Sequence, residues 1–193
     1  MISKIPLLKV LFTTLIAGLF LQSSASGREQ EAPFPMFGSG AVEVRLYTDY
    51  FCPPCRALEP DVEPVLKNLM KKNSIRLTLV DVPFNSNSPL YARYFLFTLS
   101  KNHDVEYAIH VRNILFDAAA RKDSVTSEQL EILLKSKGVA YEPRDTKPVF
   151  NRYNALIKED KIDATPTCVI IRAGKKEKFV GGPDIIKALK GLK

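Results

Sequence analysis

The sequence predicts an α/β fold in which a central sheet carries helices on both faces. Three observations lead to this fold class. A strand-like, a helix-like and a second strand-like stretch follow one another near the start, which is a βαβ unit. Two strand-like stretches and a helix close the chain as a ββα unit. Several helix-like stretches lie between the two units, at about residues 88–160, and we expect them to form a helical insertion.

Residues 1–26 have the pattern of a secretory signal peptide. Lys4 and Lys9 are the only charges before Arg28, an apolar or small-residue run follows them, and small residues at 23–26 offer a cleavage site. An uncleaved membrane anchor is the alternative, but the apolar run is shorter than the roughly 20 residues that a span needs. We expect an extended lead-in at 27–40 and a folded domain at 41–193.

The predicted βαβ unit consists of a strand at 41–50, a helix at 56–72 and a strand at 75–82. Val42, Val44 and Leu46 alternate along one face of the first strand. Pro60 and Pro64 lie inside the helix and should kink it.

The insertion is expected to hold four helices: one opening at Ser88, then 104–121, 126–138 and 147–159. Ser88 is placed to cap the first, because Pro89 suits the first helical position. Thr126 and Gln129 have the spacing of a capping box.

The ββα unit follows Pro166. It comprises strands at 167–172 and 176–180, and a last helix that opens at Gly181-Gly182-Pro183.

Charge and cysteine content argue against two classes of protein, nucleic-acid binders and disulfide scaffolds. Cleavage after Ser26 would remove two lysines and no acid, so the net charge would fall from +7 to +5. The basic residues are scattered among acids, which indicates a solvated surface and no nucleic-acid partner. Three cysteines are too few for a disulfide scaffold.

The run Tyr50-Phe51-Cys52-Pro53-Pro54-Cys55 carries the chemistry. It lies where the first strand gives way to the helix. A cysteine at a helix N-terminus meets unpaired N–H groups that stabilise its thiolate, which is the nucleophile in disulfide exchange. The second cysteine is one turn away and within reach of the first.

With its motifs in view, the chain resembles the thioredoxin superfamily and, within it, the secreted DsbA-like oxidoreductases. The match covers roughly residues 37–193. It rests on three stretches: Phe37 to Ala41, Thr48 to Arg56 with Pro60 five residues after the second cysteine, and Thr165-Pro166-Thr167 with the later Gly181-Gly182 pair.

The resemblance implies a thioredoxin fold, and a thiol–disulfide oxidoreductase acting on cysteine-containing exported proteins in the periplasm. It implies that Cys52 is the attacking thiol, Cys55 the resolving thiol and Pro166 a cis proline. Thr165 would present its backbone to an extended peptide, and Pro53 and Pro54 would support the site. No cofactor and no metal are expected, and a membrane redox partner would recycle the cysteine pair.

This sequence departs from the family's pattern at three positions. Pro54 stands where DsbA has a histidine, and Leu46 stands where thioredoxin and DsbA have a buried acid. Phe51 precedes the first cysteine in a chain without tryptophan. Because the spacer is a main determinant of the reduction potential, the direction of electron flow stays open between an oxidase and a reductase or isomerase.

Two other classes of function also stay open. A copper or zinc metallochaperone would use the two thiolates and a third ligand, and an inactive thioredoxin-like module would use neither cysteine. Cys168 is expected to be a small buried residue. Asp49 and Glu59 flank the cysteine pair and are expected to be solvated, although either is placed to accept a proton from Cys55.

Overall fold

The structure is a computed structural model and describes residues 30–121 and 126–192. The predicted signal peptide therefore lies outside the described residues. The elements in chain order are β1 (Met36–Phe37), β2 (Val42–Thr48), α1 (Pro53–Lys71), β3 (Ile75–Asp81), α2 (Ser88–Leu99), α3 (Val105–Arg121), α4 (Ser127–Ser136), α5 (Lys147–Glu159), β4 (Thr167–Arg172), β5 (Lys175–Val180) and α6 (Gly182–Lys190). No helix among the described residues is long and apolar enough to cross a membrane.

The strands form one mixed sheet in the order β1-β3-β2-β4-β5. β2 and β3 are parallel, as a βαβ unit requires, and β4 runs antiparallel to both β2 and β5. The predicted α/β thioredoxin fold is confirmed. β2 is the central strand, and its carboxyl end leads directly to the cysteine pair.

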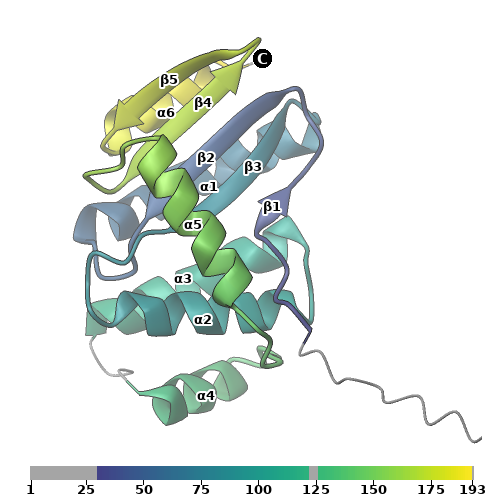
Figure 1. The fold of residues 1–193 in the computed structure, drawn as a ribbon, viewed down its shortest axis with the longest axis vertical. Helices are drawn as coiled ribbons and strands as arrows, with labels where there is room; N and C mark the ends of the chain where they lie inside the picture. The colour runs from purple at the N-terminus through teal and green to yellow at the C-terminus, as the bar shows by residue number, and fades with distance from the viewer. Residues whose placement is uncertain (1–29, 122–125, 193) are drawn as a thin grey trace, which may run out of the picture.

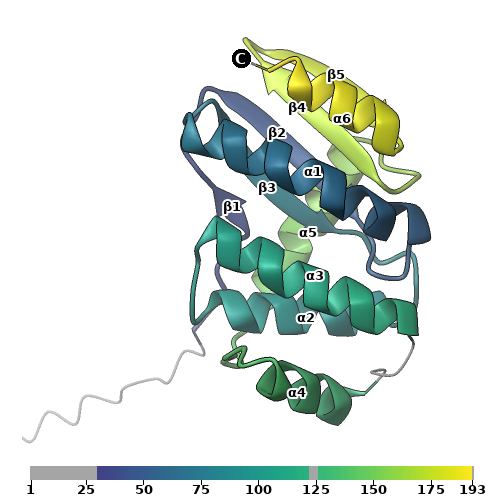
Figure 2. The same cartoon turned by 180° about the vertical axis from the view of Figure 1, so that it is seen from behind.

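Helices cover both faces of the sheet (Figures 1 and 2). α1 and α6 lie side by side on one face and α5 crosses the other, while α2, α3 and α4 lie beyond the β3 side. As a result, both faces of β2 are buried: Leu46 is 1% exposed and Tyr47 is 0% exposed. The active-site end of β2 is thus held inside a packed core rather than on a free loop.

Most of the predicted elements are confirmed to within a few residues, α5 at the expected bounds. Thr126 and Gln129 make the expected capping box at α4. α1 begins at Pro53 rather than at 56, because two prolines fit the first helical positions, where no N–H is needed. The predicted cap at Ser88 is wrong: Asn87 occupies the N-cap position of α2, and the Ser88 hydroxyl donates to Asp49 instead.

A buried carboxylate fastens the end of α5 to the sheet. Asp160 follows the last residue of α5 and its side chain has no exposed surface. It accepts hydrogen bonds from Tyr47, Arg45 and Lys176. Burial opposes ionisation here, but these donors outweigh it and lower the pKa of Asp160.

Candidate active site

Cys52 is the N-cap residue of α1, and its backbone is extended while Pro53 and Pro54 begin the helix. Cys52 and Cys55 form a disulfide with a Cα–Cα distance of 5.2 Å. The Cys55 N–H donates to Cys52 Sγ at 3.2 Å. The helix therefore offers Cys52 both a donor and the positive end of its dipole, which favours a thiolate on this sulfur.

The two sulfurs differ in access. Cys52 is partly exposed, whereas Cys55 is 0% exposed beneath the first turn of α1. Pro53 and Pro54 are exposed beside Cys52. An incoming thiolate can therefore reach Cys52 only.

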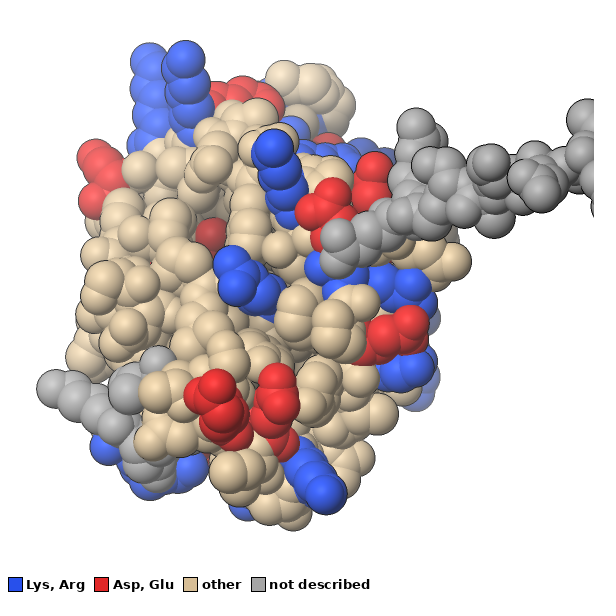
Figure 3. Space-filling view, turned by 60° about the horizontal axis from the view of Figure 1, so that its bottom comes forward, with Lys and Arg blue, Asp and Glu red and all other residues tan. Residues whose placement is uncertain are grey.

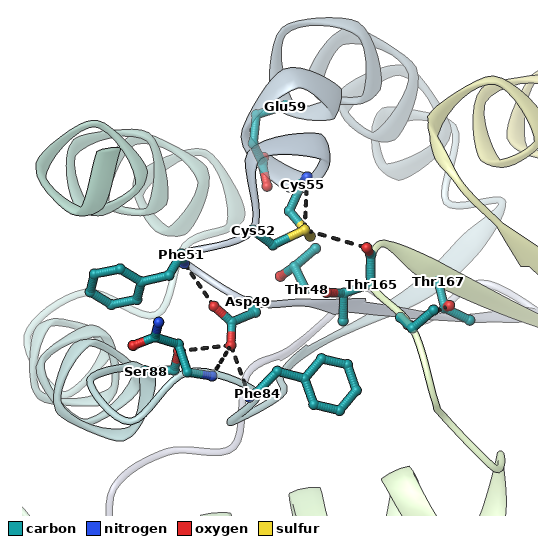
Figure 4. Close-up of a disulfide and its surroundings, with 12 residues drawn as sticks. Thr48, Asp49, Phe51, Cys52, Cys55, Glu59, Phe84, Ser88, Thr165 and Thr167 are labelled. Atoms are coloured by element: carbon teal, nitrogen blue, oxygen red, sulfur yellow. Dashed lines mark hydrogen bonds between the residues drawn. A yellow bond between two sulfur atoms is a disulfide. The ribbon is translucent and has the colours of Figure 1, made fainter. Parts of the chain in front are cut away.

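A distant segment completes the site. The Thr165–Pro166 peptide bond is cis, as the resemblance implies. The Thr165 carbonyl oxygen lies 3.3 Å from Cys52 Sγ (Figure 4). The structure thus brings Thr165 and Pro166 to the cysteine pair, although more than a hundred residues separate the two motifs in the sequence.

Asp49 is buried, which overturns the expectation that it is solvated. Its side chain is 2% exposed and accepts four hydrogen bonds (Figure 4). One oxygen takes the Phe51 N–H at 2.7 Å; the other takes the Phe84 N–H at 2.9 Å, the Asn85 N–H at 3.1 Å and the Ser88 hydroxyl at 2.7 Å. Asp49 therefore ties the segment before Cys52 to the loop that enters the insertion.

Glu59 is also buried, at 6% exposed, and the expectation for it is wrong as well. It lies one helical turn after Cys55, on the inner side of α1 (Figure 4). Its Oε1 has no hydrogen-bond partner and stands 3.6 Å from Arg112. Burial raises the pKa of Glu59, and the nearby Arg112 charge only partly offsets this effect.

Arg112 is the cation of this buried cluster. It is 1% exposed on α3, donates to Asp81 at 2.8 Å and also donates to Thr48. Its guanidinium packs over the rings of Tyr50, Phe95 and Phe116. Burial raises the pKa of Asp81, with Arg112 again opposing. The carboxyl groups of Glu59 and Asp81 and the guanidinium of Arg112 thus form a buried cluster beside the carboxyl end of β2.

Sequence reasoning missed this cluster because its members are far apart in the chain. One signal was available: Arg112 falls among Ala108, Val111 and Leu115 on the apolar side of α3. A lone cation on an apolar helix face needs a buried anion. Leu46 is a buried apolar residue that lies opposite Cys168 in the sheet. Cys168 is buried, as expected, and burial raises the pKa of its thiol to about 12.

Comparison with known proteins agrees with this geometry. Residues 39–181 match the family described as Thioredoxin. The chain is 27% identical over 197 residues to the thiol:disulfide interchange protein DsbA of Bordetella parapertussis, covering 93% of this chain and 92% of that protein.

Solved structures show the same fold. A periplasmic thioredoxin-like protein from Salmonella enterica serovar Typhimurium is 20% identical, with a TM-score of 0.59 over 81% of this chain and 87% of that chain. The catalytic domain of Proteus mirabilis ScsC is 18% identical, with a TM-score of 0.59 over 84% of this chain and 90% of that chain. Taken with the cysteine pair at the start of α1, the family match shows that this chain belongs to the thioredoxin family and is a DsbA-like thiol–disulfide oxidoreductase.

Proposed function

We propose that this protein exchanges disulfides with cysteine-containing exported proteins, with Cys52 as the attacking and Cys55 as the resolving sulfur. The observation that carries the assignment is the asymmetry of access: Cys52 is partly exposed and accepts the Cys55 N–H, whereas Cys55 is fully buried. Substrate therefore meets Cys52 first. Pro53, Pro54, Thr165 and Pro166 surround that sulfur and support the site.

When the Cys52 thiolate attacks a substrate disulfide, Cys55 then attacks Cys52 Sγ and releases the reduced substrate. In the opposite direction, which oxidises the substrate, exchange proceeds in two balanced steps. A substrate thiolate attacks Cys52 Sγ, the Cys52–Cys55 bond breaks, and Cys55 leaves as a thiolate that takes up a proton. A second substrate thiolate attacks the substrate sulfur of the mixed disulfide and releases Cys52. The substrate gains a disulfide, and its two electrons remain in the reduced cysteine pair. A membrane redox partner would accept those electrons to restore the disulfide.

The Thr165 edge would hold the substrate during this exchange. Its carbonyl lies 3.3 Å from Cys52 Sγ, so an extended peptide that pairs with this segment brings its own cysteine to the reacting sulfur. Such positioning converts a bimolecular attack into an effectively unimolecular one.

We further propose a periplasmic location after removal of residues 1–26. The apolar run with two lysines before it supports export. The resemblance to periplasmic thioredoxin-like and DsbA proteins is in keeping with it.

The roles of the two sulfurs can be tested with single serine variants. Cys55→Ser should trap a mixed disulfide with a peptide that carries a disulfide, because the Cys52 thiolate attacks that bond, one peptide sulfur leaves as a thiolate, and no resolving thiol remains to release the other; Cys52→Ser should trap none. Mass spectrometry of the non-reduced adducts measures this. In the reduced wild type, Cys52 should react faster than Cys55 with an alkylating reagent at neutral pH. Equal alkylation rates, or trapping by Cys52→Ser, would contradict the assignment.

The net direction follows from the equilibrium reduction potential of the pair, measured against glutathione. A value near that of DsbA, about −120 mV, makes the protein a disulfide donor. A value near that of thioredoxin, about −270 mV, makes it a reductase of the same fold.

A further inference from the structure

Asp49 occupies the first position of the turn that leads from β2 to Cys52. β2 ends at Thr48, and the Asp49 carbonyl oxygen accepts the Cys52 N–H at 3.1 Å, which closes a four-residue turn. One oxygen of the Asp49 carboxylate accepts the N–H of Phe51, two residues on, at 2.7 Å. Aspartate favours this first position because its side chain can bond the backbone in this way. The N–H groups of Phe51 and Cys52 therefore both donate to Asp49.

The other oxygen of the carboxylate fastens the same turn to a separate part of the fold. It accepts the Phe84 N–H, the Asn85 N–H and the Ser88 hydroxyl at 2.7–3.1 Å (Figure 4). Asp49 is 2% exposed, so water has little access to replace these donors. A buried carboxylate that accepts on both oxygens cannot move without leaving several polar groups unpaired, which costs free energy. The turn before Cys52 is thus held in place from two sides.

The turn decides which groups the Cys52 sulfur meets. Cys52 has an extended backbone as the N-cap residue of α1. From this position its Sγ accepts the Cys55 N–H at 3.2 Å and lies 3.3 Å from the Thr165 carbonyl oxygen. The donor and the dipole at a helix end act only over the first turn. A shift of the Cys52 backbone would therefore weaken the stabilisation of its thiolate.

Few charged side chains are present to stabilise the thiolate in another way. Three segments surround Cys52, namely residues 50–55, 82–92 and 164–171, and none contains Lys, Arg, Asp or Glu. The loop between β3 and α2 lies on the left in Figure 1, and the left half of the view in Figure 3 is mostly free of charged side chains. Apart from Arg56, which is exposed on the first turn of α1, the Cys52 thiolate depends on the helix end and hence on its own orientation.

We propose that Asp49 is a positioning residue for disulfide exchange, which holds Cys52 where the end of α1 stabilises its thiolate. The proposal rests on the proposed function, because it concerns the reactivity of the same sulfur. All four partners of the Asp49 side chain are donors, as an ionised carboxylate requires. Its charge alone opposes a second negative charge on Cys52, whereas the geometry that it imposes favours one. The two effects have opposite signs, so a substitution distinguishes them.

The test measures the redox equilibrium of the Cys52–Cys55 pair with glutathione in Asp49→Ala. The reduced form carries the thiolate, so loss of positioning should lower the equilibrium constant for reduction of the pair roughly fivefold, the scale of one N-cap contact. The pH midpoint for alkylation of reduced Cys52 by iodoacetamide should rise. Asp49→Asn should change both quantities less but in the same direction, because an amide has one acceptor oxygen and cannot serve both sides of the turn. This second variant decides the question if Asp49→Ala does not fold.

Asp104→Ala is the matched control. Asp104 also accepts the N–H two residues on, from Glu106 at 2.8 Å, but it precedes α3 and lies outside the three segments around Cys52. Its loss should lower the free energy of unfolding and leave the glutathione equilibrium and the alkylation midpoint unchanged. Urea unfolding of the oxidised and the reduced form measures stability for each variant. A contact that only supports the fold stabilises both forms equally and does not change the equilibrium between them.

An unchanged glutathione equilibrium in the folded Asp49 variants, with equal loss of stability in the two redox forms, would overturn the proposal and leave Asp49 a structural contact. A higher equilibrium constant for reduction, or a lower alkylation midpoint, would also overturn it, because the charge of Asp49 would then outweigh its geometry. Failure of the proposed function would look different: the wild-type cysteine pair would not exchange with glutathione.

Discussion

Glu59 stands out among the residues near the site because it is a buried acid without a hydrogen bond to its Oε1. It occupies the turn of α1 that follows Cys55, and Leu46 leaves the neighbouring strand position without an acid. The groups that face it are Arg112 from α3, Asp81 from β3 and Glu63 from its own helix. Burial, Asp81 and Glu63 therefore favour the protonated form of Glu59, and Arg112 opposes them.

A pH dependence of stability follows for Glu59. Burial raises its pKa in the folded protein above the ordinary value of 4.5. Above pH 4.5 the folded state thus holds a proton that the unfolded state has lost, and the free energy of unfolding falls as the pH rises. Glu59→Gln should remove this loss, about 1.4 kcal/mol for each unit of raised pKa. Urea unfolding from pH 4.5 to 8 measures the difference between the two proteins.

Glu63 provides the control on the same helix. Its pKa is lowered by hydrogen bonds from Lys67 and Asn113, so its contribution is present at neutral pH and lost as the pH falls. Glu63→Gln should therefore change stability with the opposite sign. A difference between wild type and Glu59→Gln that stays constant over the pH range would contradict the assignment.

Pro54 is predicted to influence the reduction potential of the Cys52–Cys55 pair. It is an exposed residue at the second position of α1 and supplies neither an N–H nor a charge to Cys52. Pro54→His should stabilise the reduced form and raise the reduction potential by roughly 30 mV or more, since 30 mV corresponds to about a tenfold change in the equilibrium constant. Equilibration with glutathione measures it.

Pro54→Ala separates the effect of the backbone N–H from the effect of the imidazole. It restores the backbone N–H without adding an imidazole, so its potential should lie between those of wild type and Pro54→His. A potential that falls or does not move in Pro54→His would show that the spacer does not control this pair.

Among the elements, α5 is joined to the sheet by a buried carboxylate. Asp160 joins its end to β2 and β5 through Tyr47, Arg45 and Lys176. α5 also supplies Phe150 and Asn154 to the wall of a cavity of about 170 Å³ beside the end of β3. The position of this helix on the sheet therefore decides the shape of the cavity.

Asp160→Asn should cost about 1.5–3 kcal/mol at neutral pH, the range for hydrogen bonds to a charged group. The lowered pKa of Asp160 means that its stabilisation is present above the unfolded value of 3.8 and is lost as the pH falls through the lower folded value. The variant should therefore lose less stability than wild type on acidification. Chemical unfolding at pH 7 and at pH 3 tests both statements, and parallel loss in the two proteins would contradict them.

Local patterns predicted the elements better than they predicted the contacts. The bounds of α5 and β4 follow from apolar spacing and neighbouring prolines. β1 has only two residues, which is too short to show a period of apolar residues. It is a strand because it pairs with β3 at Leu77 and Thr78, which are distant in the sequence. The cysteine pair is a local signal, whereas the Thr165 contact was expected only from the family resemblance.

The buried acids show most clearly what local sequence patterns cannot predict. The partners of Asp49 lie up to 39 residues further along the chain, at Phe84, Asn85 and Ser88. Arg112, which faces Glu59, is on another helix. Charge alone indicates a solvated side chain, and only the fold reveals which carboxylates are enclosed.

For the molecule as a whole, the active site lies on the boundary between two parts. The sheet with α1 and α6 supplies the cysteine pair and the Thr165 edge, and the insertion supplies α2 and α3, which follow the loop after β3. Asp49 and Arg112 are two of the polar links across this boundary, and both are buried. The helical insertion thus helps to shape the site and does more than cover the sheet.

The two outer strands of the sheet have a further consequence. A sheet edge attracts any extended chain, and unfolded chains are the material that this protein is proposed to handle. At one edge of the sheet, β1 has only two residues. At the other edge, β5 is mostly exposed and carries Lys175, Lys176 and Lys178. Short edges and lysines are how native sheets discourage unwanted strand addition and aggregation. A substrate chain that pairs at Thr165, as proposed, would therefore not meet an outer strand that favours aggregation.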